Sequence, residues 1–89
     1  MPTAYIPISL RVTAREGRHQ AFRTDIERLT MDSAHASLST VGSTDKTACL
    51  RGAVATGEHT ASEAALARFL EDRLVTKGIH LDITANFES

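Results

Sequence analysis

Residues 5–13 read YIPISLRVT, a segment in which apolar and polar side chains alternate. Alternation with a period of two is typical of a β-strand that buries one face in a core. The inward set of this strand is Ile6, Ile8, Leu10 and Val12. Residues 79–87 alternate in the same way, and their inward set is Leu81, Ile83, Ala85 and Phe87. The two segments are therefore predicted to be strands that share one core.

Two helices are expected between these strands. Residues 17–31 place Phe22, Ile26 and Leu29 on one stripe, with the period of a helix. The charged residues are expected around the rest of that helix: Arg18, Arg23, Asp25, Glu27 and Arg28. A second helix follows Gly57 and is expected to bury Ala65, Leu66, Phe69, Leu70 and Leu74.

The ends of the second helix carry recognisable signals. Thr60 and Glu63 have the spacing of a capping box, in which each side chain bonds to the backbone of the other residue. Lys77 and Gly78 form a basic last turn followed by a residue suited to a left-handed cap. We therefore predict a helix that starts with Thr60 as its cap and ends at Gly78.

Two further strands complete the pattern. Residues 36–43 form a weak, Ser/Thr-rich strand that ends near a turn at 42–46, and residues 47–56 form a strand of small residues. Gly52 within the latter is expected to mark a bulge or the close approach of another chain. The order β-α-β-β-α-β with right-handed crossovers predicts one ferredoxin-like α+β sandwich over residues 1–89, with a four-stranded antiparallel sheet and two helices on one face.

Composition narrows the class of protein. The chain has 89 residues, with three Phe, one Tyr and no Trp, so aliphatic residues and alanine must fill a small core. A second copy would cover apolar surface that such a core leaves exposed, so a homo-oligomer, most simply a dimer, is expected. The net charge of −1 argues against nucleic-acid binding through phosphate neutralisation.

Sequence features also set expectations for location and cofactors. A single cysteine, Cys49, cannot form an internal disulfide, which favours a reducing, cytoplasmic compartment. No apolar run is long enough for a membrane span, so no membrane insertion is expected. The four histidines and Cys49 lack metal-ligand spacing, and Cys49 would meet His80 only in a favourable register. Neither a metal nor another cofactor is expected.

The sheet face opposite the helices is the predicted site of interaction. It lacks the aromatic side chains on which sheet-binding RNA would stack. Its small residues suit packing against a second sheet, provided that Arg11 and Arg51 find partners, with Asp82 and Glu88 as the nearest carboxylates. The predicted interface comprises Ser9, Arg11, Thr13, Arg51, Ala53, Ala55, Asp82 and Thr84.

No residue set stands out as catalytic, but one enzymatic alternative rests on Pro2. After removal of Met1, the secondary amine of Pro2 would act as a base in a dry site, as in the tautomerases, which are also built from β-α-β units. Pro2, Ile6 and Ile8, followed by Glu16-Gly17-Arg18, are similar to the opening of that family. Under this alternative, Pro2 and Arg18 would carry the chemistry.

The whole pattern resembles ACT-like domains, and most closely the C-terminal domain of MgtC/SapB-type bacterial proteins. The segments that carry the resemblance are Leu10-Arg11-Val12, Phe22…Ile26…Leu29, Leu38-Ser39, Ala53-Val54-Ala55 and Leu66…Leu70…Leu74. The resemblance implies a ferredoxin-like module that dimerises through its sheet and has a regulatory or protein-interaction role. No ligand-binding residue of the family is carried over.

Two other functions stay open. The opening strand followed by Arg15-Glu16-Gly17-Arg18 and Phe22 is similar to small dimeric cofactor-independent monooxygenases, whose cavity lies between sheet and helices. A phage-type protein inhibitor of a host complex is the third class. A non-enzymatic module is the function that we expect from the sequence.

Overall fold

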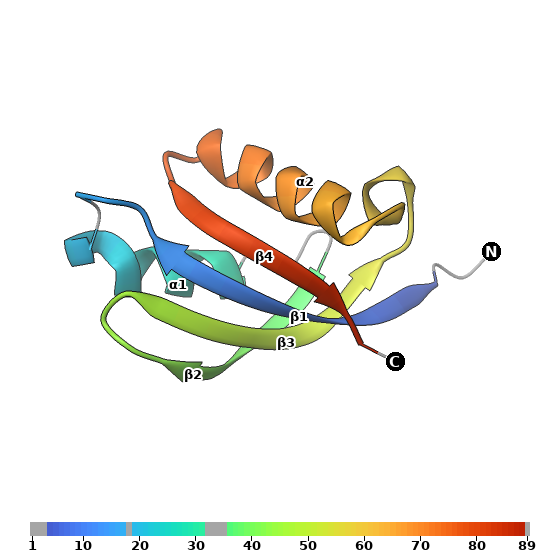
Figure 1. Cartoon of the computed structure of the whole chain (residues 1–89), viewed down its shortest axis with the longest axis horizontal. Coiled ribbons are helices and arrows are strands. Elements are labelled where there is room, and N and C mark those ends of the chain that lie inside the picture. The colour runs from blue at the N-terminus through green and yellow to red at the C-terminus, as the bar shows by residue number, and fades with distance from the viewer. Residues whose placement is uncertain (1–3, 18, 32–35, 89) are drawn as a thin grey trace.

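The fold is a four-stranded antiparallel sheet with two helices, as seen in a computed structural model that describes residues 4–17, 19–31 and 36–88 (Figure 1). The strands follow the spatial order β2-β3-β1-β4. The elements in chain order are β1 (Tyr5–Ala14), α1 (Phe22–Met31), β2 (Ala36–Ser43), β3 (Thr47–Ala55), α2 (Glu63–Val75) and β4 (Leu81–Phe87). Short 3-10 turns, η1 (His19–Ala21) and η2 (Glu58–Thr60), precede the two helices. The predicted ferredoxin-like α+β sandwich is confirmed.

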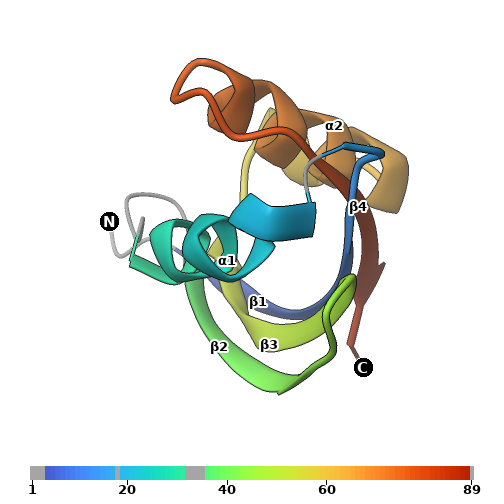
Figure 2. The same cartoon turned by 90° about the vertical axis from the view of Figure 1, so that its left-hand side faces the viewer.

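The sheet curves around the helices, so its helix-free face is convex (Figure 2). Within the described chain, α2 packs along β4 and α1 lies against β2, which are the two edge strands. Each helix therefore covers one flank of the concave side. In the described part of the chain, no second layer packs on the convex side.

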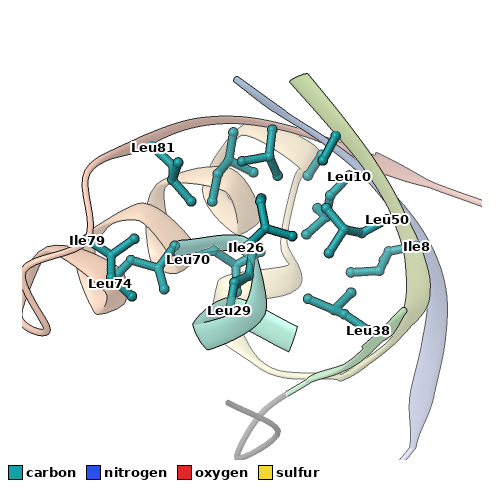
Figure 3. Packing of buried hydrophobic residues seen from close by; sticks show 14 of the residues in the cluster. Ile8, Leu10, Ile26, Leu29, Leu38, Leu50, Leu70, Leu74, Ile79 and Leu81 are labelled. Carbon is teal, nitrogen blue, oxygen red and sulfur yellow. The ribbon is translucent and has the colours of Figure 1, made fainter. Parts of the chain in front are cut away.

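The core lies between the concave face and the helices (Figure 3). Ile8, Leu10 and Leu50 from the two central strands are at most 2% exposed, and they meet the leucines of α2. The alternation in β1 and β4 predicted the inward side chains of these two strands correctly, with one exception. Phe87 was expected inside but is 37% exposed, because it ends an edge strand and no further strand lies beside it.

Helix α1 buries the predicted stripe of Phe22, Ile26 and Leu29, and it also buries Asp25, which was expected on the exposed side. Asp25 follows Phe22 by three positions and precedes Leu29 by four, so it lies on the flank of the same stripe. Its side chain is only 3% exposed. The prediction of an exposed Asp25 was therefore wrong.

Helix α2 is capped by Ser62, and the predicted capping box at Thr60 and Glu63 was wrong. The Ser62 hydroxyl accepts a hydrogen bond from the Ala65 N–H at 3.0 Å. The Thr60 hydroxyl instead accepts from the Gly57 N–H and closes the 3-10 turn η2. A turn between Thr60 and the helix moved the cap by two residues.

The predicted C-terminal cap of α2 is confirmed. Gly78 has a φ of 77°, and its N–H donates to the Val75 carbonyl. The Ile79 N–H donates to the Leu74 carbonyl at 3.0 Å, which completes a Schellman motif. Ile79 and Leu74 are both buried, so the motif also joins the end of α2 to the core.

Gly52 marks a close approach within this chain. A Cβ atom at Gly52 would overlap the carbonyl oxygen of Ser37 on β2 and lie 2.8 Å from the carbonyl carbon. The bulge that was one expectation for Gly52 lies elsewhere, between Thr40 and Gly42 of β2. Only glycine lets β2 run this close to β3.

Candidate interaction surface

The convex face of the sheet carries the eight residues predicted as an interface. The register places Ser9 opposite Arg51, Thr13 opposite Asp82 and Arg11 opposite Thr84. Ala53 and Ala55 lie on the same face of β3, opposite Pro7 and Tyr5. We call this surface the open face; its members are Tyr5, Pro7, Ser9, Arg11, Thr13, Ser37, Ser39, Cys49, Arg51, Ala53, Ala55, Asp82, Thr84 and Asn86.

Two ion pairs lie at the margins of the open face. Arg51 Nη2 is 3.8 Å from Glu88 Oε1, the partner that the sequence suggested. Asp82 Oδ1 instead pairs with Arg15 Nε at 3.1 Å, a partner that the sequence did not indicate. Both pairs are well exposed, so each contributes little to stability.

Arg11 occupies the middle of the open face. It is exposed, and within the described residues it makes no ion pair. The neighbours directly opposite it are Cys49 on β3 and Thr84 on β4, neither of which bears a carboxylate. Arg11 is therefore a cation available to an external partner.

Cys49 was not part of the predicted interface, although the structure places it on the open face. It is a free, exposed thiol opposite Arg11 and beside the bulge of β2. A meeting with His80 does not occur. Cys49 lies opposite Arg11 of β1, and Arg11 lies opposite Thr84 of β4. His80 comes before the first residue of β4.

The two edges of the sheet differ in a way that the sequence did not predict. Glu71 Oε1 accepts from the Ile83 N–H at 3.0 Å, and Glu63 Oε2 accepts from the Phe87 N–H at 2.7 Å. We call Glu63 and Glu71 the edge carboxylates. Both come from α2 and bind the backbone of β4, so that edge is partly occupied from within the chain.

A cleft of about 630 Å³ lies between α1 and the β2–β3 hairpin. Phe22 and Ile26 give it an apolar part, and polar side chains give it the rest. The charged and titratable residues around it are His19, Arg23, Glu27 and Asp45. Its volume is in the range of small-molecule sites.

Pro2 and Arg18, the residues of the enzymatic alternative, lie outside the described residues. Among residues 4–17, 19–31 and 36–88, no three potential ligands gather as a metal site. In the same part of the chain, no helix is long and apolar enough to cross a membrane.

Comparison with known protein families, with curated proteins and with solved structures finds no match to this chain.

Proposed function

We propose that this chain is a small non-enzymatic interaction module, of the regulatory ACT-like type, that self-associates through its sheet. The observation that carries the proposal is that the sheet is uncovered in two places. Among the described residues, no helix packs on its convex side, and no strand pairs with the outer edge of β2.

The chemistry of the open face supports this role. Serine, threonine and alanine predominate, and such small side chains allow another backbone to come close. Arg11 is the central charged group and has no carboxylate opposite it within its own sheet. A partner that neutralised Arg11 would stabilise the complex and fix its orientation.

The thin core gives a physical reason for association. The described core consists of aliphatic residues, alanine and the single aromatic Phe22. Several larger apolar side chains stay exposed: Tyr5, Met31, Val41, Val75 and Phe87. A second copy would remove part of this surface from water, at about 25 cal/mol per Å².

Light scattering at micromolar concentration is expected to give twice the mass of the chain. The Arg11→Glu variant reports on the open face, because a shift toward the monomer would place the contact between copies there. Arg23→Glu, at an exposed position of α1, is the matched control. A wild-type monomer at every concentration would contradict the proposal.

A second candidate function is favoured by the cleft beside α1. Its place between a helix and the sheet is that of the cavity in the small cofactor-independent monooxygenases, to which residues 5–22 are similar. In this function His19 would face the substrate. The test measures the rate of oxygen uptake with an electron-rich hydroquinone as substrate. A rate for the wild-type protein above that of the His19→Ala variant would support this function.

A further inference from the structure

The hydrogen-bonding groups at the β4 edge show which positions face away from the sheet. The Glu88 N–H donates to the Pro7 carbonyl of β1 at 2.9 Å, so the N–H groups of even-numbered residues in β4 point inward. Those of Leu81, Ile83, Ala85 and Phe87 consequently point outward. Two of these four outward donors, those of Ile83 and Phe87, are bound by the edge carboxylates.

The spacing of Glu63 and Glu71 along α2 matches the spacing of the two N–H groups that they bind along β4. Glu63, Ala67 and Glu71 recur every fourth residue, and these three residues line a groove with Ile83 and Ala85. An added strand would have to displace both carboxylates and place its own carbonyl oxygens beside them. Charge-assisted hydrogen bonds of this kind are about twice as strong as neutral ones. The β4 edge is therefore protected against strand addition from Ile83 to Phe87.

The β2 edge has no comparable protection. In the described part of the chain, no side chain accepts a hydrogen bond from a β2 N–H group. From Ser37 to Ser43 the strand has no charge and no proline, and only Leu38 is buried. The bulge between Thr40 and Gly42 bends its end but leaves Ala36–Thr40 in regular register. Natural edge strands usually carry lysine, proline or covering side chains to prevent pairing.

A second copy of this chain is the occupant that fits the β2 edge. An uncharged strand can pair with itself around a two-fold axis without placing like charges opposite each other. An exposed apolar side chain belongs to the same strand, Val41 at 62% exposed. The convex open face is less suitable, because two convex surfaces touch over a small area.

We propose that two copies pair β2 against β2, and that the edge carboxylates stop the assembly at two by closing β4. This inference rests on the self-association proposed above. If both edges were open, β2–β2 and β4–β4 contacts would alternate, and two different two-fold interfaces generate an open chain of molecules. Glu63 and Glu71 thus set the size of the assembly.

The test compares two double variants by light scattering over a range of concentrations, with circular dichroism to verify folding. E63A/E71A removes both acceptors and should form species larger than a dimer, whose mass rises with concentration. E63Q/E71Q retains an amide oxygen at each position and should stay dimeric. A folded E63A/E71A with the mass of the wild type at every concentration would overturn the role of the edge carboxylates. A monomeric wild type would instead overturn β2 pairing together with the proposed function.

A lysine substitution locates the pairing edge. Val41→Lys, at an exposed position of β2, should dissociate the wild-type dimer and should limit E63A/E71A to two copies. Thr24→Lys, at an exposed position of α1, is the matched control and should leave the dimer intact. Dissociation by Arg11→Glu with retention of the dimer in Val41→Lys would place the contact on the open face and overturn β2 pairing.

Discussion

Replacing Gly52 with alanine is expected to lower the free energy of unfolding by about 3 kcal/mol, the upper end of the usual cost of overpacking. The new Cβ would overlap the Ser37 carbonyl oxygen, and a backbone atom cannot swing aside as a flexible side chain can. The strand β2 must move away from β3 or lose its pairing near Leu38. Urea denaturation of the two proteins measures the difference.

Gly42→Ala is the matched control for this prediction. Gly42 also belongs to β2, but a Cβ atom there meets nothing within 4 Å. Its replacement should change the free energy of unfolding by less than about 0.5 kcal/mol. A Gly52→Ala protein as stable as Gly42→Ala would show that β2 does not run as close to β3 as described.

Leu70→Ala is expected to cost about 2–5 kcal/mol, because it leaves a cavity between α2 and the sheet. Leu70 is 4% exposed and lies one turn before Leu74 on the inward side of α2 (Figure 3). Thermal or urea denaturation measures the loss. Val75→Ala on the same helix is the control, since Val75 is 44% exposed and should cost under about 1 kcal/mol. A loss below about 1 kcal/mol for Leu70→Ala would mean that α2 is not packed in this way.

The sequence predicted those parts of the fold that depend on local periodicity. Alternation at residues 5–13 determined which side of β1 is buried, and Gly78 predicted the left-handed end of α2. The errors lie where a local signal competes with its surroundings. Both Thr60 and Ser62 can cap a helix, and only the turn η2 decides between them.

The candidate site was predictable to a smaller extent. Strand alternation was sufficient to assign the open face, because side chains on one face recur every second residue. The partners of its charges depend on how different elements meet, so the pairing of Arg15 with Asp82, which are 67 positions apart, was missed. The edge carboxylates were missed for the same reason: Glu63 and Glu71 look like ordinary exposed helix residues until α2 is placed beside β4.

The single thiol allows a direct distance measurement between copies. Cys49 is exposed on β3, one strand in from the β2 edge, so a spin label can be attached without a further substitution. Pairing of β2 with β2 separates the two Cys49 residues by three strand spacings, about 14 Å, plus an offset along the strands. Packing of two open faces would bring the sheets to about 10 Å from each other.

Electron–electron distance measurement between labels on Cys49 therefore tests self-association through the sheet most directly. Pairing at the β2 edge predicts one distribution of distances at roughly 20–30 Å, including the linker of the label. That distribution should disappear in the Val41→Lys variant. The absence of any coupling between labels in the wild type, or a distribution that persists unchanged in Val41→Lys, would contradict this account.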